Sequence, residues 1–244
     1  MRAMKFLFAA LALLIVPGNP ASAEDNTVDL LLVLAADVSR SVDYPKFKLQ
    51  REGYATAATD PRVLNAITSG IHGRIAVTFV EWAGYGQQKV VVDWTLIDGP
   101  EAAAHFSEQV LKAPRSFSDR TSISEAIDFS AGLFASAPYK STRRTIDISG
   151  DGTNNSGPSV QMARDNAVAQ GVTINGLVIL TPAPEMWNAS HTNPPGGLEE
   201  YFRQSVIGGP SAFVLAAEDF NSFGQAIVKK LIAEIASLEA PGVR

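Results

Sequence analysis

The sequence of 244 residues contains no cysteine. This absence excludes a disulfide framework, thiolate metal sites, cysteine nucleophiles and redox pairs. The fold therefore has to be stabilised by its apolar core, and a chain of this length can bury enough surface for that. After the first 23 residues, no apolar run reaches the roughly 20 residues that a membrane-spanning helix needs.

Positive charge is also scarce, because 20 Lys and Arg stand against 25 Asp and Glu, for a net charge of −5. An acidic chain repels a polyanion at long range, which argues against a nucleic acid partner. The GxSxG, Walker, GxGxxG and HExxH patterns are absent as well. His72, His105 and His191 do not have the spacing of metal ligands and are interpreted as ordinary surface or packing residues. We therefore do not expect an enzyme.

The first residues have the pattern of a secretory signal peptide. Two basic residues precede the apolar run Phe6–Val16, and Ala21-Ser22-Ala23 offers a cleavage site flanked by small residues. The apolar run is shorter than a membrane span. We predict that residues 1–23 are removed on export and that residues 24–244 form one domain. The expected location is the periplasm, with secretion as the alternative.

Six segments predict strands. Five of them are almost continuously apolar, which is typical of strands covered on both faces of a parallel sheet. These five are Val28–Ala36, Arg74–Trp82, Arg143–Ser149, Val172–Leu180 and Ala212–Ala217. The sixth, Lys89–Ile97, follows Arg74–Trp82 after a connector too short for a crossover helix. It is therefore predicted to be an antiparallel edge strand.

Helical patterns lie between these strands, with apolar residues at three- and four-residue steps. They are Pro45–Thr59, Pro100–Leu111, Ser122–Phe134, Ser159–Gln170 and Phe220–Leu238. Strands that alternate with helices imply right-handed βαβ crossovers. The expected fold class is α/β, with a doubly wound, mostly parallel six-stranded sheet and one antiparallel edge strand. The proline-rich segment Thr181–Gly197 is predicted to be an irregular loop, either a tolerated insertion or a lid beside a ligand site.

Oxygen-bearing side chains occur at three of the predicted junctions between strands and helices. Asp37, Ser39 and Ser41 are spaced two residues apart at the exit of the first strand, Asp151 follows another strand, and Thr121 opens a helix. The carboxyl ends of parallel strands meet at one sheet edge, where ligands bind in open α/β folds. Carboxylates and hydroxyls are hard donors that suit Mg²⁺ first, and also Mn²⁺ or Ca²⁺. These five residues form a candidate divalent cation site.

Each part of this pattern also has a simpler interpretation. Ser41 or Asp43 could cap the helix that opens at Pro45, and Thr121 could cap the helix that it precedes. Asp151-Gly152 could be an ordinary turn. Three such coincidences at one sheet edge are less expected than a single site.

Three segments resemble the metal ion-dependent adhesion site (MIDAS) of von Willebrand factor A domains. They are Asp37-Val38-Ser39-Arg40-Ser41, Thr121 with Glu125-Ala126-Ile127, and Gly150-Asp151-Gly152. The order of strands and helices is similar along all of residues 24–244. Gly73–Ala83 and Ile148–Asn155 further resemble a bacterial group of exported A-type domains with no assigned function.

The resemblance implies a ligand set in which Ser39, Ser41 and Thr121 contact the ion through hydroxyl oxygens. Asp37 and Asp151 would hold it directly or through water. The usual Thr of the family before the second Asp is replaced by Gly150, which leaves these ligands intact.

In such a site one coordination position is left open for an Asp or Glu of a protein partner. The expected function is therefore an exported binding module. One alternative is a metal-dependent hydrolase that uses the same cluster, and another is a structural A-type domain without metal affinity. Asp147, inside a predicted strand, is interpreted as a satisfied strand residue rather than as support for the site.

Overall fold

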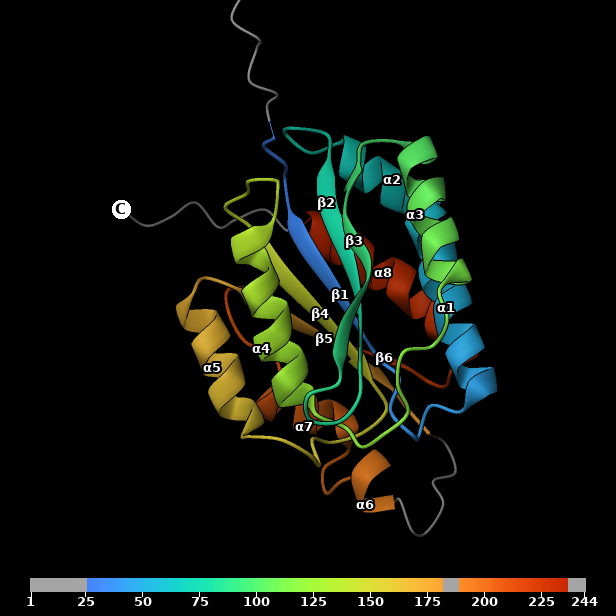
Figure 1. The fold of residues 1–244 in the computed structure, drawn as a ribbon, viewed down its shortest axis with the longest axis vertical. Helices are drawn as coiled ribbons and strands as arrows, with labels where there is room; N and C mark the ends of the chain where they lie inside the picture. Colours follow the sequence, from blue (N-terminus) through green and yellow to red (C-terminus); the bar gives the residue numbers. More distant parts are fainter. Residues whose placement is uncertain (1–25, 182–188, 237–244) are drawn as a thin grey trace, which may run out of the picture.

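The computed structural model describes residues 26–181 and 189–236, so the predicted signal peptide lies outside the described residues. Six strands form one sheet in the order β3-β2-β1-β4-β5-β6 (Figure 1). They are β1 (Leu31–Asp37), β2 (Ile75–Trp82), β3 (Gln88–Ile97), β4 (Arg144–Gly150), β5 (Thr173–Ile179) and β6 (Val214–Ala217). All neighbouring pairs are parallel except β2 with β3. The predicted sheet, with its antiparallel edge strand, is confirmed.

Helices cover both faces of this sheet. They are α1 (Tyr44–Thr59), α2 (Pro61–Thr68), α3 (Pro100–Lys112), α4 (Ile123–Leu133), α5 (Val160–Ala169), α6 (Ala189–Thr192), α7 (Leu198–Ser205) and α8 (Phe223–Ala236), with a short 3-10 turn at Phe134–Ser136. Figure 1 shows α4 and α5 on one face, and α1, α2, α3 and α8 on the other. None of the described helices is long and apolar enough to cross a membrane.

The position of β1 inside the sheet, between two helical layers, explains why its first six residues are apolar. All seven of its residues are buried. Leu32 and Leu34 pack into the core beneath α1 and α8, whereas Leu31 and Val33 pack into the core beneath α4 and α5. Because successive side chains of a strand point to opposite faces, a strand between two helical layers needs apolar residues at every position.

Three helices, α2, α6 and α7, were missed by the sequence interpretation. Asp60 and Pro61 were expected to end a helix, and α1 does end at Thr59, but the same residues also begin α2. The Asp60 carboxylate accepts the Arg62 N–H (2.8 Å), and proline suits the first turn of a helix because it has no N–H to leave unpaired. The other two are α7 and the short α6, which lies within the segment predicted to be irregular.

A buried ionic cluster joins α8 to the sheet. Lys230 on α8 lies 2.7 Å from Asp147 Oδ1 on β4 and also pairs with Glu234 one turn further along α8. The Asn175 amide donates to Glu234 (2.9 Å). These side chains are almost completely buried. Asp147 is therefore not the satisfied strand residue expected, since two carboxylates share one ammonium and Asp147 Oδ2 accepts no hydrogen bond within the described residues.

Burial raises the pKa of the Asp147 carboxyl to about 7, with Lys230 opposing the shift and Glu234 adding to it. The folded protein therefore holds a proton that the unfolded chain, with a pKa of 3.8, has lost between about pH 4 and pH 7. The contribution of Asp147 to the free energy of unfolding should fall as pH rises through this interval and stay low above it.

We predict that the free energy of unfolding of Asp147→Asn, in which Lys230 is paired with Glu234 alone, increases relative to the wild type by about 3 kcal/mol between pH 4.5 and pH 8. Urea unfolding of the wild type and the variant across this pH range measures the difference between them. Asp98→Asn, a substitution of an exposed carboxylate, is the matched control. A difference that is constant with pH would contradict the role given to Asp147.

Candidate metal centre

The five predicted site residues lie together at the carboxyl edge of the sheet. Asp37 is the last residue of β1, and Asp151 directly follows β4, the neighbouring parallel strand. Ser39 and Ser41 lie in the loop from β1 to α1, and Thr121 lies just before α4. Ser41 is half-buried, and the other four are at most 2% exposed.

Hydrogen bonds link four of these residues directly. The Ser39 N–H donates to Asp37 Oδ1 (2.7 Å), and the Ser39 and Ser41 hydroxyl oxygens lie 3.1 Å apart. The Ser41 hydroxyl donates to Asp151 Oδ1 (2.6 Å). The first and third sequence segments are thus joined through side chains although they lie 110 residues apart in the chain. Thr121 makes none of these contacts.

The structure assigns the helix caps to residues other than Ser41 and Thr121. The cap of α1 is Asp43, which accepts the Lys46 N–H (2.9 Å), so that Ser41 is left to bond Asp151. The cap position of α4 is Ser122 and not Thr121. Asp151 is fully buried, unlike the aspartate of an ordinary surface turn.

The two carboxylates lack compensation. Asp37 Oδ2 and Asp151 Oδ2 are buried without a hydrogen-bond partner among the described residues, and the nearest cation, Lys46 Nζ, lies 4.0 Å from Asp151 Oδ2. Burial, with the charge of Asp151, raises the pKa of Asp37 to about 8, and burial also raises the pKa of Asp151. Two buried carboxylates side by side are costly unless a cation neutralises them.

This donor set fits a divalent cation of the hard class. Within residues 26–181 and 189–236, no group of three or more His, Cys, Asp and Glu side chains is placed to hold a metal ion. The candidate centre instead combines two carboxylates with hydroxyl oxygens, which suits Mg²⁺. Gly150 leaves space beside it, because a Cβ at this position would lie 3.2 Å from Asp37 Oδ2.

His191, from the proline-rich segment, reaches the site. Its Nε2 lies 3.3 Å from the Thr121 hydroxyl and its Nδ1 lies 3.2 Å from the Thr153 hydroxyl. A Cβ on Gly152 would lie 2.1 Å from His191 Nε2, so glycine is required there for the ring to approach. The interpretation of His191 as an ordinary surface or packing residue was wrong. The sequence did contain one signal for this contact, because the segment with His191 follows β5, whose carboxyl end lies at the same sheet edge as the site.

The neighbouring amide indicates which nitrogen of His191 carries the proton. Asn155 Oδ1 accepts the backbone N–H of Thr121 (2.9 Å), so its Nδ2 faces His191 Nδ1 at 3.4 Å. An amide NH₂ only donates, which makes Nδ1 the acceptor and leaves the proton on Nε2, toward Thr121. Burial lowers the pKa of His191, in keeping with a neutral ring.

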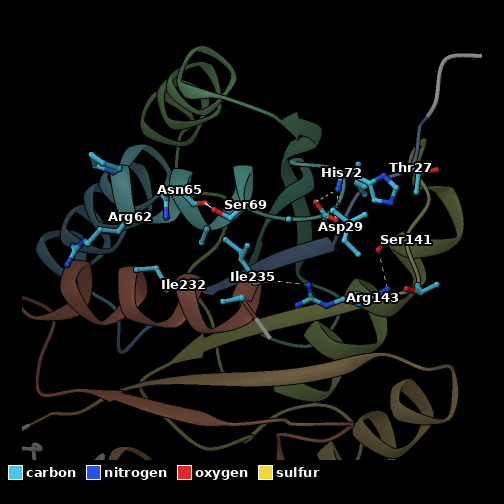
Figure 2. Close-up of a pocket in the computed structure, with 17 residues that line it drawn as sticks. Thr27, Asp29, Arg62, Asn65, Ser69, His72, Ser141, Arg143, Ile232 and Ile235 are labelled. Atoms are coloured by element: carbon cyan, nitrogen blue, oxygen red, sulfur yellow. Dashed lines mark hydrogen bonds between the residues drawn. The ribbon is translucent and has the colours of Figure 1, made fainter. Parts of the chain in front are cut away.

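A pocket of about 1040 Å³ lies away from the candidate metal centre, at the opposite edge of the sheet, between α2, α8 and the start of β1 (Figure 2). Its polar groups serve the fold. Asp29 accepts the backbone N–H of His72 (2.9 Å), and Arg143 donates to the carbonyl of Ile235 (3.2 Å) near the end of α8. Among the described residues that line this pocket, Asp29 is the only carboxylate.

The sheet order, the helical layers and the polar edge at β1 and β4 define a von Willebrand factor A (VWA) fold. Proximal thread matrix protein 1 from the mussel byssus has this fold, with a TM-score of 0.63 and 11% identity over 86% of this chain and 49% of that one. A von Willebrand factor type A protein from Catenulispora acidiphila aligns with a TM-score of 0.56 and 16% identity, over 85% of this chain and 43% of that one.

A further structure of the mussel protein has a zinc-occupied MIDAS motif, with a TM-score of 0.59 and 13% identity over 86% of this chain and 48% of that one. At these identities the likeness establishes the fold alone, and the chain spans less than half the length of these structures. Residues 27–239 match the family model of a protein of unknown function, DUF1194, and the chain belongs to this family. No curated protein sequence matches the chain.

We predict that Asp37→Asn raises the melting temperature of the metal-free protein by about 2–6 °C at pH 8.5, since it removes one of two uncompensated buried charges. The asparagine Oδ1 can still accept the Ser39 N–H. Differential scanning calorimetry in EDTA measures the shift, with Asp98→Asn as the exposed control. A lower melting temperature for Asp37→Asn would mean that the carboxylates are compensated by the fold.

Proposed function

We propose that this protein is an exported binding module that uses a divalent cation at Asp37, Ser39, Ser41, Thr121 and Asp151 to capture an acidic group of a protein partner. The proposal rests above all on one observation. Asp37 and Asp151, at the ends of adjacent strands, are buried with one unpartnered oxygen each. When bound, a divalent cation supplies the missing positive charge and an open coordination position for a carboxylate.

The protein positions these donors through its own contacts. The Ser39 N–H orients the Asp37 carboxylate, and the Ser41 hydroxyl orients that of Asp151. Arg115 donates to the carbonyl oxygens of Val38 (2.6 Å) and Ser39 (2.9 Å), which holds the loop from outside. A site whose ligands are oriented before binding does not have to order a flexible loop on binding.

The size of the opening favours a small acidic group over a large substrate. A pocket of about 120 Å³ opens beside Ser41, Thr121 and His191. Small-molecule sites usually measure about 300–1,000 Å³, so this pocket suits one or two side chains of a partner.

The hard oxygen donors favour Mg²⁺, with Mn²⁺ or Ca²⁺ as alternatives. The zinc-occupied MIDAS motif of the mussel protein supports a divalent cation at a motif of this kind. Export to the periplasm rests on the signal-peptide pattern of residues 1–23.

We predict that saturating Mg²⁺ or Mn²⁺ raises the melting temperature of the wild type by about 5–10 °C, because an ion at a hundred times its Kd adds about 2.7 kcal/mol. Asp37→Ala should abolish this rise and leave the fold intact, as judged by circular dichroism. Asp98→Ala, at an exposed position, should respond as the wild type does. An undiminished response of Asp37→Ala would refute the site assignment.

The position of His191 favours a second candidate, a metal-dependent hydrolase. The segment that carries His191 places an imidazole 3.3 Å from the Thr121 hydroxyl, where it could exchange a proton with water at the centre. On this candidate, wild-type protein with Mn²⁺ hydrolyses a chromogenic phosphoester or ester, and His191→Ala loses that activity but keeps the metal-induced rise in melting temperature. If the wild type hydrolyses the substrate no faster than Asp37→Ala does, the hydrolase candidate is refuted.

A further inference from the structure

Two arginines flank the candidate metal centre. Arg40 lies between the two serines of the first loop, and Arg120 directly precedes Thr121. The Arg40 N–H donates to the carbonyl of Asp119 (2.7 Å), which ties the two loops together. Both arginines are exposed, and both line the pocket of about 120 Å³ beside Ser41 and Thr121.

Neither guanidinium is held by the fold. In the part of the chain that the structure describes, no hydrogen bond, ion pair or ring contact engages the side chain of Arg40 or Arg120. Other exposed arginines are paired, such as Arg62 with Asp60 (2.8 Å) and Arg203 with Glu200 (2.9 Å). Cations repel a metal ion nearby, so these two arginines do not serve to bind the ion itself.

The charges around the opening point to the ligand. The charged side chains that line the pocket, or that belong to the centre or contact its carboxylates, are Asp37, Asp119 and Asp151 against Arg40, Lys46 and Arg120. Summed over the whole opening, these formal charges cancel in the absence of an ion, but of these cations only Lys46 lies within 4.0 Å of either buried carboxylate of the centre. A divalent cation leaves an excess of two positive charges at the opening of an otherwise acidic protein. One carboxylate from a partner neutralises only half of this excess.

We propose that the site recognises two neighbouring carboxylates of an acidic protein segment. The open position at the metal centre takes one carboxylate, and Arg40 and Arg120 take the other. This inference rests on the proposed function and adds the class of partner. A guanidinium fits a carboxylate with two parallel hydrogen bonds, which makes arginine well suited to the second position. Two adjacent acidic side chains and an acidic residue at a chain terminus both present this chemistry.

Calorimetric titration with three short peptides in Mg²⁺ tests the proposal, the first two blocked at both ends and the third at its amino terminus only. One peptide carries a single Asp, one carries two adjacent Asp, and a third ends in a single Asp with a free carboxyl terminus. The wild type should bind both dicarboxylate forms about tenfold or more tightly than the single-Asp peptide. The third peptide distinguishes a chain terminus from an internal acidic pair as the preferred source.

The double variant R40Q/R120Q should lose this preference, while its affinity for Mg²⁺, measured by the same calorimetry, is at least that of the wild type. K140Q/K229Q, which removes two exposed cations away from the pocket, is the charge-matched control and should keep the preference. Equal binding of all three peptides by the wild type in Mg²⁺ overturns this inference and leaves the proposed function standing. A wild type that does not bind Mg²⁺ refutes the proposed function. A preference for the dicarboxylate peptides that R40Q/R120Q retains refutes the role of the arginines.

Discussion

The ends of β1 and β4 place two carboxylates in the interior of the protein, and much of the surrounding structure follows from this placement. Asp37 and Asp151 are fully buried and each keeps an oxygen without a partner. Burial away from water, and in second place the charge of Asp151, raises the pKa of Asp37 to about 8. The Ser39 N–H and the hydroxyls of Ser39 and Ser41 link the carboxylates without neutralising them. The proposed cation would neutralise these charges, which connects the stability of this edge to its proposed function.

The proline-rich segment gives this edge a feature that the three-part motif does not contain. Its short helix α6 brings His191 over Thr121, and Gly152 provides the space for the ring. The Thr153 N–H donates to the carbonyl of His191 (3.0 Å), which anchors the segment to the loop after β4. The imidazole and the two unpaired arginines thus surround the same small opening, so that a partner meets donors of hydrogen bonds on several sides.

Buried charge also joins α8 to the sheet. Lys230 joins Asp147 on β4 to Glu234 on its own helix, and Asn175 on β5 completes the cluster. Such a cluster contributes little net stability, because desolvation offsets its attraction, but removing one partner leaves a buried charge uncompensated. Asp147 lies on β4, four residues before Asp151, but its partners are different from those of Asp151.

The sequence by itself determined the features that depend on local periodicity and composition. Apolar residues at the first six positions of β1 require two covering layers, and the short connector before β3 requires an antiparallel edge, so the sheet was predictable. The gathering of the candidate carboxylates and hydroxyls at one edge was predictable too, because parallel strands bring their carboxyl ends together. By contrast, α2 was missed because Asp60 and Pro61 both end one helix and begin the next.

Only the tertiary structure decided which of several local roles each polar residue takes. The sequence allowed Ser41 to be a cap or a ligand, and the hydrogen bond to Asp151 depends on contacts between residues far apart in the chain. For His191 the distance in sequence from Thr121 gave no sign of their contact. The pairing of Asp147 with Lys230 was equally hidden, since a buried charge finds its partner across a packed interface and not along the chain.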